Sequence, residues 1–413
     1  MSKSCFDVLR ATADDLQNSL QTRKITSVQI VEQYLDQICL YEPILHALIL
    51  ARSQLRGPLH GIPIILKRLI DAGMIILAKS NMTEFGGMKT LKIMPGWSPH
   101  GGQTILPYMG PIKENERLLG HSARGSSTGS SVSVAAGFSP LAIGVETIGS
   151  IITPSTRAAL YALKSTVGVQ DCTGMYKMSD FYDSPGPMAK CAIDVLHVSE
   201  VLLGRSLTVE KMETWGGISV AFLDPKKWQM AEEMCEQIDG SAEQMSEDYQ
   251  ATISKLREHG CWVKYLVEVA ETSTLIVDGK EAIIPIAYWV LKNIGIPQII
   301  AGFDKCAVHT LSDIISFNEQ HRSESMPEPD GYNHSPERVV RLKDGLRARG
   351  KAVLDEVFDG EEVNIIAALG DSPLCVHAAA AGYLIAAAPI STLRYNGCPF
   401  GLCLVAKGGG EEV

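Results

Sequence analysis

The chain has 413 residues, and 46% of them are apolar, so it can bury a sizeable core and global disorder is excluded. Its 37 basic and 47 acidic residues give a formal net charge of −10. Contacts with phosphates need clustered Lys and Arg, and the sequence has no basic stripe. We therefore expect no nucleic-acid partner.

The first 22 residues are polar and charged and lack the apolar core of a signal peptide. Of the longest apolar stretches, residues 374–389 carry His377 and Tyr383, and residues 139–145 are too short to cross a bilayer. The ten cysteines include no CxxC pair and no Cys/His spacing typical of zinc. These observations predict a cytoplasmic protein with no membrane partner and no metal site.

The first third of the chain predicts helices followed by buried strands. Apolar residues at helical spacing over 5–45 predict two helices, with Thr26-Ser27 as the N-cap of the second. Residues 58–67 predict a turn followed by a strand that is buried on both faces and ends at Lys67. Residues 74–78 predict a second buried strand.

A long segment rich in Gly, Pro and Ser follows. Residues 81–85 predict a turn or a short helix, and residues 86–130 predict a loop. A loop of that length inside a compact protein is usually functional. It leads into a predicted helix at 132–138 and a predicted strand at 141–145.

The second half of the chain differs in composition from the first. Residues 205–360 are richer in charge, with helical periodicity at 228–260 and 336–358, and we predict a variable, mostly helical lobe. Residues 361–405 return to apolar runs typical of core strands and helices. Buried strands interleaved with helices indicate an α/β fold.

Two turns of small residues present serines beside glycines. Ser126 and Ser150 lie 24 residues apart in these turns, and Lys67 lies upstream. A serine hydroxyl is a poor nucleophile until a base removes its proton, and lysine is such a base only when burial keeps it neutral. A second serine can relay the proton, and the backbone N–H groups of residues 147–150 can face a developing oxyanion.

Other interpretations of these residues are open. Gly/Ser clusters are most often ordinary loops, and a lysine after an apolar run often reaches water. Gly125-Ser-Ser-Thr-Gly129 also fits G-x-S-x-G, which would make Ser127 the nucleophile of an esterase with Asp371 and His377. That motif needs a buried strand before it, and residues 113–124 are too polar for one. A further hypothesis pairs Glu146 with Arg157.

A series of short segments spans nearly the whole chain in a fixed order. The segments are Thr26-Ser27 with Tyr34-Leu35, Gly57-Pro-Leu-His-Gly-Ile-Pro-Ile-Ile-Leu-Lys67, Leu77-Ala-Lys-Ser-Asn-Met-Thr-Glu-Phe85, Gly125-Ser-Ser-Thr-Gly-Ser130, Gly144-Val-Glu-Thr-Ile-Gly-Ser-Ile151, Leu163-Lys-Ser-Thr-Val-Gly168, Asp183-Ser-Pro-Gly-Pro-Met-Ala189 with Asp194, and Asn396-Gly-Cys-Pro-Phe-Gly401. This ordered series resembles the amidase signature family. An ordered series is far more specific than any one of its motifs.

The resemblance implies an α/β amidase-signature fold, a mixed central sheet surrounded by helices. It implies a single domain over residues 1–413, with the lobe at 205–360 inside it. The implied reaction is hydrolysis of a carboxylic amide C–N bond through an acyl-enzyme, on a small-molecule amide and without a metal or organic cofactor. The oligomeric state is not implied.

The resemblance also implies a catalytic site. In the family a lysine and two serines form the triad, with one serine as nucleophile, and backbone amides form the oxyanion hole. These roles fall on Lys67 and Ser126 as the proton relay, Ser150 as the nucleophile, and Thr147, Ile148 and Gly149 as the oxyanion hole.

The sequence departs from the family pattern around these positions. Family members place more chain between the lysine and the serine pair, and Arg68 and Leu69 replace the Asp-Asn that follows the lysine. Arg124, Thr128 and Ile148 stand at glycine positions, and Ile152 stands at an arginine position. An alternative hypothesis is therefore a catalytically degenerate amidase-fold protein that acts as a scaffold or partner subunit.

Overall fold

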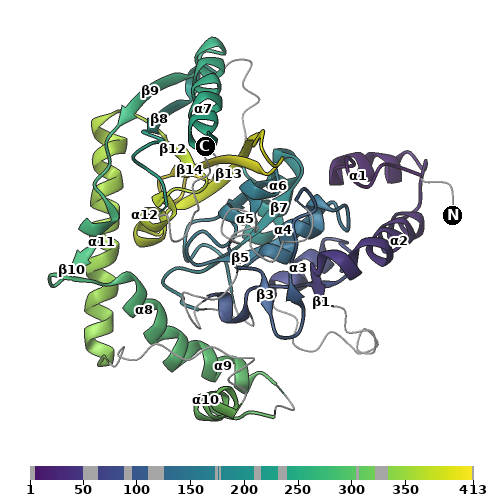
Figure 1. Cartoon of the computed structure of the whole chain (residues 1–413), viewed down its shortest axis with the longest axis horizontal. Helices are drawn as coiled ribbons and strands as arrows, with labels where there is room; N and C mark the ends of the chain where they lie inside the picture. The colour runs from purple at the N-terminus through teal and green to yellow at the C-terminus, as the bar shows by residue number, and fades with distance from the viewer. Residues whose placement is uncertain are drawn as a thin grey trace.

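The computed structural model describes residues 5–49, 64–87, 95–109, 125–172, 175, 178–208, 215–230, 240–303, 307–320 and 334–411, without the side chains of residues 64–67. An eight-stranded sheet runs through the centre of the molecule (Figure 1). In order across the sheet its strands are β5 (Leu141–Glu146), β7 (Ser184–Ala189), β6 (Tyr161–Lys164), β13 (Leu384–Thr392), β14 (Pro399–Ala406), β12 (Ile365–Leu369), β8 (Ser219–Leu223) and β9 (Trp262–Val267).

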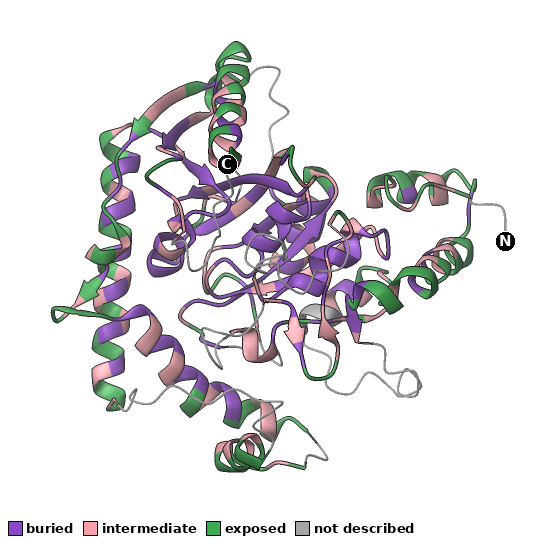
Figure 2. Ribbon diagram, in the orientation of Figure 1, coloured by how far each residue is buried: buried purple, intermediate pink, exposed green. Residues whose placement is uncertain are grey.

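The sheet is mixed, as the family resemblance implies. The pairs β8·β12 and β8·β9 are parallel, whereas β5·β7, β6·β7, β6·β13, β13·β14 and β12·β14 are antiparallel. Every residue of β7 is buried, as expected of a strand covered on both faces. Figure 2 shows that the sheet and the short helices beside it are the most buried part of the molecule.

Helices surround the sheet. Those that pack on the sheet include α4 (Thr128–Ala135), α5 (Ile152–Arg157), α6 (Ala192–Leu203), α7 (Ser241–Glu258), α11 (Pro336–Gly360) and α12 (Leu374–Ala381). Small residues let α11 and α12 lie close together, because a Cβ at Gly350 would sit 2.6 Å from the carbonyl carbon of Ala380. The strands and helix predicted within 361–405 are confirmed by β12, α12, β13 and β14.

The two predicted N-terminal helices are confirmed as α1 (Ala13–Gln21) and α2 (Ser27–Leu45). Thr26 is the N-cap of α2, and its side chain accepts a hydrogen bond from the Gln29 N–H. The start of α1 is held by another helix, because the buried carboxylate of Asp194 in α6 accepts from the N–H groups of Ala13 at 2.7 Å and Asp14 at 3.0 Å.

Replacing Asp194 with alanine is expected to lower the free energy of unfolding by about 2 kcal/mol, because two N–H groups lose a charged acceptor. Urea unfolding followed by circular dichroism measures the loss. Asp36→Ala, on the exposed side of α2, is the control and should change stability by less than about 0.5 kcal/mol. Equal stability of the two variants would contradict the capping role of Asp194.

The predictions of two buried strands near Lys67, at 58–67 and 74–78, are wrong in the residues that the structure describes. Residues 64–71 form helix α3 (Ile64–Asp71), which packs against α6, and residues 50–63 lie outside the described part. Leu69 faces α6 in a buried cluster, and Arg68 donates to the Leu202 carbonyl oxygen at 2.5 Å. A short apolar run cannot separate a buried strand from a helix by periodicity alone.

The segment predicted as a second buried strand, 74–78, is irregular, and Ile75 is 59% exposed. Only its continuation is paired, as strand β2 (Lys79–Ser80) against β1 (Leu48–Ile49). The predicted turn or short helix at 81–85 is confirmed by η1 (Glu84–Gly87). The long loop contains the hairpin β3 (Trp97–Ser98) and β4 (Gly102–Gln103), and the predicted helix and strand after it correspond to α4 and β5.

Residues 205–360 are not only helical. The predicted helices are present as α7 and α11, but β8 and β9 from this region are strands of the central sheet. Neither strand was predicted from the sequence. The region also contains η3 (Trp215–Gly217), η4 (Thr272–Thr274), the hairpin β10 (Ile276–Val277) and β11 (Lys280–Glu281), α8 (Ile283–Val290), η5 (Leu291–Gly295), α9 (Ile296–Ala301) and α10 (Leu311–Gln320).

In Figure 1 the run α8–α9–α10 extends away from the sheet at the lower left. Within the described residues, one helical stretch, Ile283–Ala301, has the length and composition of a membrane-crossing helix. It lies outside the apolar stretches at 374–389 and 139–145 that the sequence analysis considered. Core helices of water-soluble proteins pass the same test, so this stretch is weak evidence for a membrane span.

Candidate active site

The first serine-bearing loop, residues 125–127, precedes α4. We call it the serine-pair loop. Gly125 has a φ of +98°, and a Cβ there would lie 2.5 Å from Cδ of Pro154 and 3.2 Å from the Gly149 carbonyl oxygen. The left-handed backbone and the close approach both require glycine at this position.

The second serine-bearing loop, residues 147–150, joins β5 to the turn that leads into α5, and we call it the nucleophile turn. Gly149 has a φ of +76°, which again favours glycine. The two loops are in contact, because the Ser127 N–H donates to the Ser150 carbonyl oxygen at 3.2 Å. Ser126 and Ser150 are 9% and 8% exposed, so both predicted triad serines lie on adjacent, nearly buried loops.

The third predicted triad residue, Lys67, lies in α3, and the position of its side chain is outside the described part of the structure. Its distance to the two serines therefore stays untested. The structure brings together the loops of two of the three residues, and the roles assigned to all three stay predictions.

The nucleophile turn is held from both ends by buried carboxylates. One oxygen of Glu146 accepts from the N–H groups of Ile151 at 2.7 Å and Ile152 at 2.9 Å, directly after Ser150. At the other end, the Thr147 hydroxyl donates to Asp183 at 2.7 Å. Neither contact was predicted from the sequence.

Asp183 lies just before β7 and is 5% exposed. Burial raises the pKa of its carboxyl to about 6, and hydrogen bonds from Thr147, Ser179 and Met178, together with the charge of Lys164, oppose this rise. The charged form of Asp183 is thus maintained by donors that point at it, and the carboxyl titrates close to neutral pH.

The predicted oxyanion-hole residues form the nucleophile turn itself. Within the described part of the chain, no acceptor takes a hydrogen bond from the N–H groups of Ile148 or Gly149. Thr153 N–H donates to the Gly149 carbonyl oxygen at 3.0 Å, which fixes the turn to α5. Two backbone donors beside a serine are the arrangement that stabilises a tetrahedral oxyanion.

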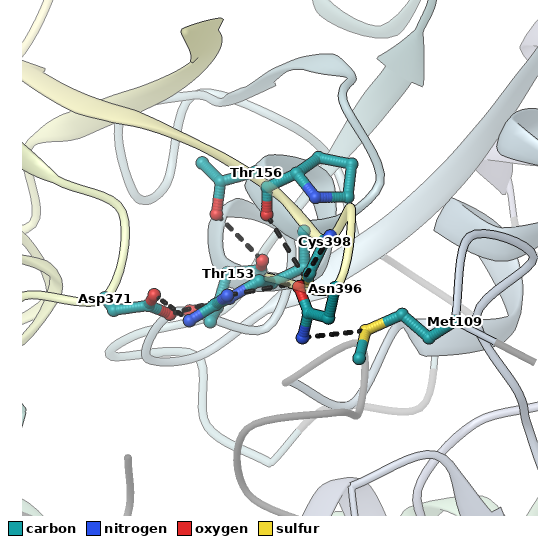
Figure 3. A network of polar contacts seen from close by, with 8 residues as sticks. Met109, Thr153, Thr156, Asp371, Asn396 and Cys398 are labelled. Carbon is teal, nitrogen blue, oxygen red and sulfur yellow. Dashed lines mark hydrogen bonds and ion pairs between the residues drawn. The ribbon is translucent and has the colours of Figure 1, made fainter. Parts of the chain in front are cut away.

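Arg157 pairs with Asp371 and not with Glu146, so the hypothesis of a Glu146–Arg157 pair is wrong. Arg157, at the end of α5, pairs with the Asp371 carboxylate, and its guanidinium also lies 3.5 Å from Cys398 Sγ. Figure 3 shows this polar network, with Asp371, Cys398, Asn396 and Met109 labelled. Asn396 accepts from the Cys398 N–H at 2.9 Å and donates to Met109 Sδ at 4.0 Å. The network joins α5 to the turn before β14 and to the long loop.

Replacing Arg157 with methionine is expected to lower the free energy of unfolding by about 3–5 kcal/mol, because the Asp371 carboxylate stays buried without its partner. Chemical denaturation measures the loss. Arg394→Met is the matched control, since Arg394 and Glu247 form an exposed pair at 3.2 Å, and it should cost less than about 1 kcal/mol. Similar losses in the two variants would contradict the importance of burial.

The esterase alternative with Ser127, Asp371 and His377 is wrong. The Ser127 hydroxyl donates to the Val145 carbonyl oxygen at 3.1 Å and accepts from the Val145 N–H at 3.2 Å, so it fastens the serine-pair loop to β5. Asp371 pairs with Arg157, and His377 Nε2 lies 2.8 Å from the Ala270 carbonyl oxygen. The three residues therefore do not form one hydrogen-bonded site.

Among the described residues, no group of three His, Cys, Asp or Glu side chains is placed to hold a metal ion. The polar groups around the serine loops are hydroxyls, carboxylates and backbone amides. This set suits acyl transfer through a serine.

Comparison with known proteins shows similarity to one family. The sequence model described as Amidase matches residues 65–264. The chain is 27% identical over 260 residues to a protein named "Probable amidase" from Arabidopsis thaliana, covering 51% of this chain and 49% of that protein. It is also 27% identical over 246 residues to one component of the glutamyl-tRNA(Gln) amidotransferase of Acidothermus cellulolyticus, covering 48% and 46%. The chain spans about half the length of the curated relatives it matches.

Solved structures match over more of the chain. The native peptide amidase of Stenotrophomonas maltophilia superposes with a TM-score of 0.79 at 23% identity, covering 98% of this chain and 94% of that one. An amidase family protein from Bacillus anthracis gives a TM-score of 0.79 at 19% identity, covering 98% and 89%. The fold is that of the amidase signature enzymes. Together with the match over residues 65–264, it confirms the predicted resemblance to the amidase family.

Proposed function

We propose that this chain hydrolyses a carboxylic amide C–N bond through an acyl-enzyme on Ser150, with Ser126 and Lys67 as the proton relay. The contact between the serine-pair loop and the nucleophile turn carries the proposal, because it sets two nearly buried serines on adjacent loops. The match of residues 65–264 to the amidase family supports it.

The reaction follows from the roles of these groups. Ser150 Oγ attacks the amide carbon while its proton passes to Ser126, which gives its own proton to neutral Lys67. The oxyanion receives hydrogen bonds from the N–H groups of the nucleophile turn. The amine leaves with a proton returned through the relay, and water then cleaves the acyl-enzyme by the same route.

The substrate class is a small-molecule amide, in line with the names of the structural neighbours, which include a peptide amidase and a 6-aminohexanoate cyclic dimer hydrolase. No step of this mechanism uses a metal or an organic cofactor. A cytoplasmic location without a membrane or nucleic-acid partner remains part of the proposal.

The second candidate is a non-catalytic partner subunit, which the departures around Lys67 and the similarity to a component of an amidotransferase favour. Labelling of the purified protein with a fluorophosphonate, followed by peptide mass spectrometry, separates the two. A covalent adduct on Ser150 supports the hydrolase, because only an activated serine reacts. Absence of any adduct between pH 7 and pH 10 supports the partner subunit.

A further inference from the structure

A lysine that the proposed mechanism does not use lies fully buried beside the site. Lys164 is the last residue of β6 and is 0% exposed. Its Nζ has no hydrogen-bond partner among the described residues. A buried ammonium group without hydrogen bonds is costly, and it persists only where opposite charges lie close by.

The sheet topology supplies those charges. Strands β5 and β6 are both antiparallel to β7, so they run in the same direction and their last residues lie toward the same end of the sheet, where Glu146 pairs with Ser184. Glu146 ends β5, Lys164 ends β6, and Asp183 precedes the first residue of β7 at this end. Glu146 is 1% exposed and Asp183 is 5% exposed, so this end of the sheet holds two buried carboxylates and one buried ammonium group.

The groups that act on Lys164 come from every element around it. Burial lowers the pKa of the Lys164 ammonium group, whereas Glu146 and Asp183 raise it. Arg347 of α11 lowers it and Cys375 of α12 raises it. Burial is the largest of these effects, and the two carboxylates are the main groups that oppose it.

We propose that Lys164 is a positioning residue of the active site, whose buried positive charge balances the carboxylates of Glu146 and Asp183, which hold the nucleophile turn at both ends. Glu146 binds the two N–H groups after Ser150, and Asp183 binds the hydroxyl of Thr147, the first residue of the turn. This inference rests on the proposed role of Ser150.

Loss of the ammonium group would leave two buried carboxylates at this end of the sheet without a counter-charge. Asp183, whose carboxyl pKa burial already raises, then takes up a proton more readily, because Lys164 no longer lowers that pKa. A protonated carboxyl is a weaker acceptor than a carboxylate, so one end of the nucleophile turn loosens. Lys164 is fully buried and does not reach a substrate, so the rate of acylation should fall while binding changes little.

The test compares Lys164→Met with the wild-type chain on an aryl amide. We expect kcat to fall about 10–100-fold with KM changed less than about threefold, since small misplacements of reacting groups have effects of this size. Lys264→Met is the matched control, because Lys264 lies in β9 of the same sheet and pairs with Glu361 at 2.8 Å far from the serine loops. It should keep the wild-type kcat.

The pH dependence separates positioning from general damage. We compare the ratio of the variant kcat to the wild-type kcat at each pH. The titration of the base Lys67 cancels in this ratio, because the same base acts in both proteins. The Asp183 carboxyl has its pKa raised to about 6 with Lys164 present, and removal of Lys164 raises it further. The ratio should therefore rise with pH as the carboxyl regains its charge. A ratio that stays constant from pH 6 to pH 10 overturns the proposal.

Removal of the excess negative charge provides the rescue. Asp183→Asn keeps an acceptor for Thr147, so Lys164→Met combined with Asp183→Asn should recover at least part of kcat. If Lys164→Met does not fold, the double variant is measured alone, and a double variant that also fails to fold or to react overturns the proposal. Wild-type protein without a fluorophosphonate adduct refutes both proposals, whereas a labelled wild type with an unaffected Lys164→Met refutes only this one.

Discussion

Replacing Ser150 with alanine is expected to abolish fluorophosphonate labelling and to lower kcat/KM by about ten-thousand-fold or more, because no other group can form the acyl-enzyme. The fold should tolerate the change. Ser150 holds its neighbours through its backbone carbonyl, which accepts from the Ser127 N–H, and alanine keeps that contact. The free energy of unfolding should therefore change by less than about 1 kcal/mol.

The two neighbouring serines provide the controls. Ser127→Ala removes both hydrogen bonds to the backbone of Val145, so it should cost about 1–2 kcal/mol of stability while labelling continues. Ser126→Ala removes the relay and should slow acylation about a hundred-fold or more. Labelling that survives in Ser150→Ala but disappears in Ser127→Ala would show that Ser127, and not Ser150, is the nucleophile.

The elements that the sequence predicted well are those with local signals. The N-cap at Thr26 and the helical spacing after it define α2 without help from the rest of the chain. Helix α3 shows the opposite case. Its residues, 64–71, are apolar enough for a buried strand, and only its packing against α6 makes them a helix.

Strands β8 and β9 were missed for a related reason. They lie in a region whose charge and periodicity favour helices. Their place at the end of the sheet depends on the pairing of β8 with β12, more than 140 residues away along the chain, and β9 in turn pairs with β8. A strand of five or six residues carries little signal of its own. Its long-range partner supplies most of the information that defines it.

In the candidate active site, too, the local motifs were predicted and the long-range contacts were not. The motif order identified the loops of Ser126 and Ser150, and the structure sets these loops in contact. Their supports could not be predicted, because each partner is distant in sequence. Asp183 reaches Thr147 across 36 residues, and Asp371 reaches Arg157 across 214.

The departures from the family pattern are accommodated where the structure describes them. Thr128, at a glycine position, is fully buried, and its hydroxyl donates to the Gly125 carbonyl oxygen at 2.7 Å. It faces Gly96, where a Cβ would approach its methyl carbon to 2.8 Å. Ile152, at an arginine position, is fully buried in the main core. The contact between the two serine loops is therefore present together with these substitutions.

The catalytic base is expected to make activity rise steeply with pH. The block that the family places after the lysine is missing here, so less chain is present to dehydrate the end of Lys67. A hydrated lysine keeps its ordinary pKa of about 10.4. Below that value, its neutral fraction grows about tenfold for each unit by which the pH rises. Activity should therefore increase with pH, because the neutral amine is the active form. Between pH 7 and pH 9, kcat/KM on an aryl amide should rise about a hundred-fold.

A pH–rate profile with two variants decides this prediction. Lys67→Met removes the base and should show only the weak slope of hydroxide-driven hydrolysis, whereas Lys79→Met, which changes an exposed lysine of β2, should reproduce the wild-type profile. A wild-type plateau that is already complete at pH 7 would mean that Lys67 is dehydrated despite the missing block. Inactivity across the whole range, together with no fluorophosphonate adduct, would instead identify the chain as a partner subunit, because an amidase fold without a working base keeps its surfaces but not its chemistry.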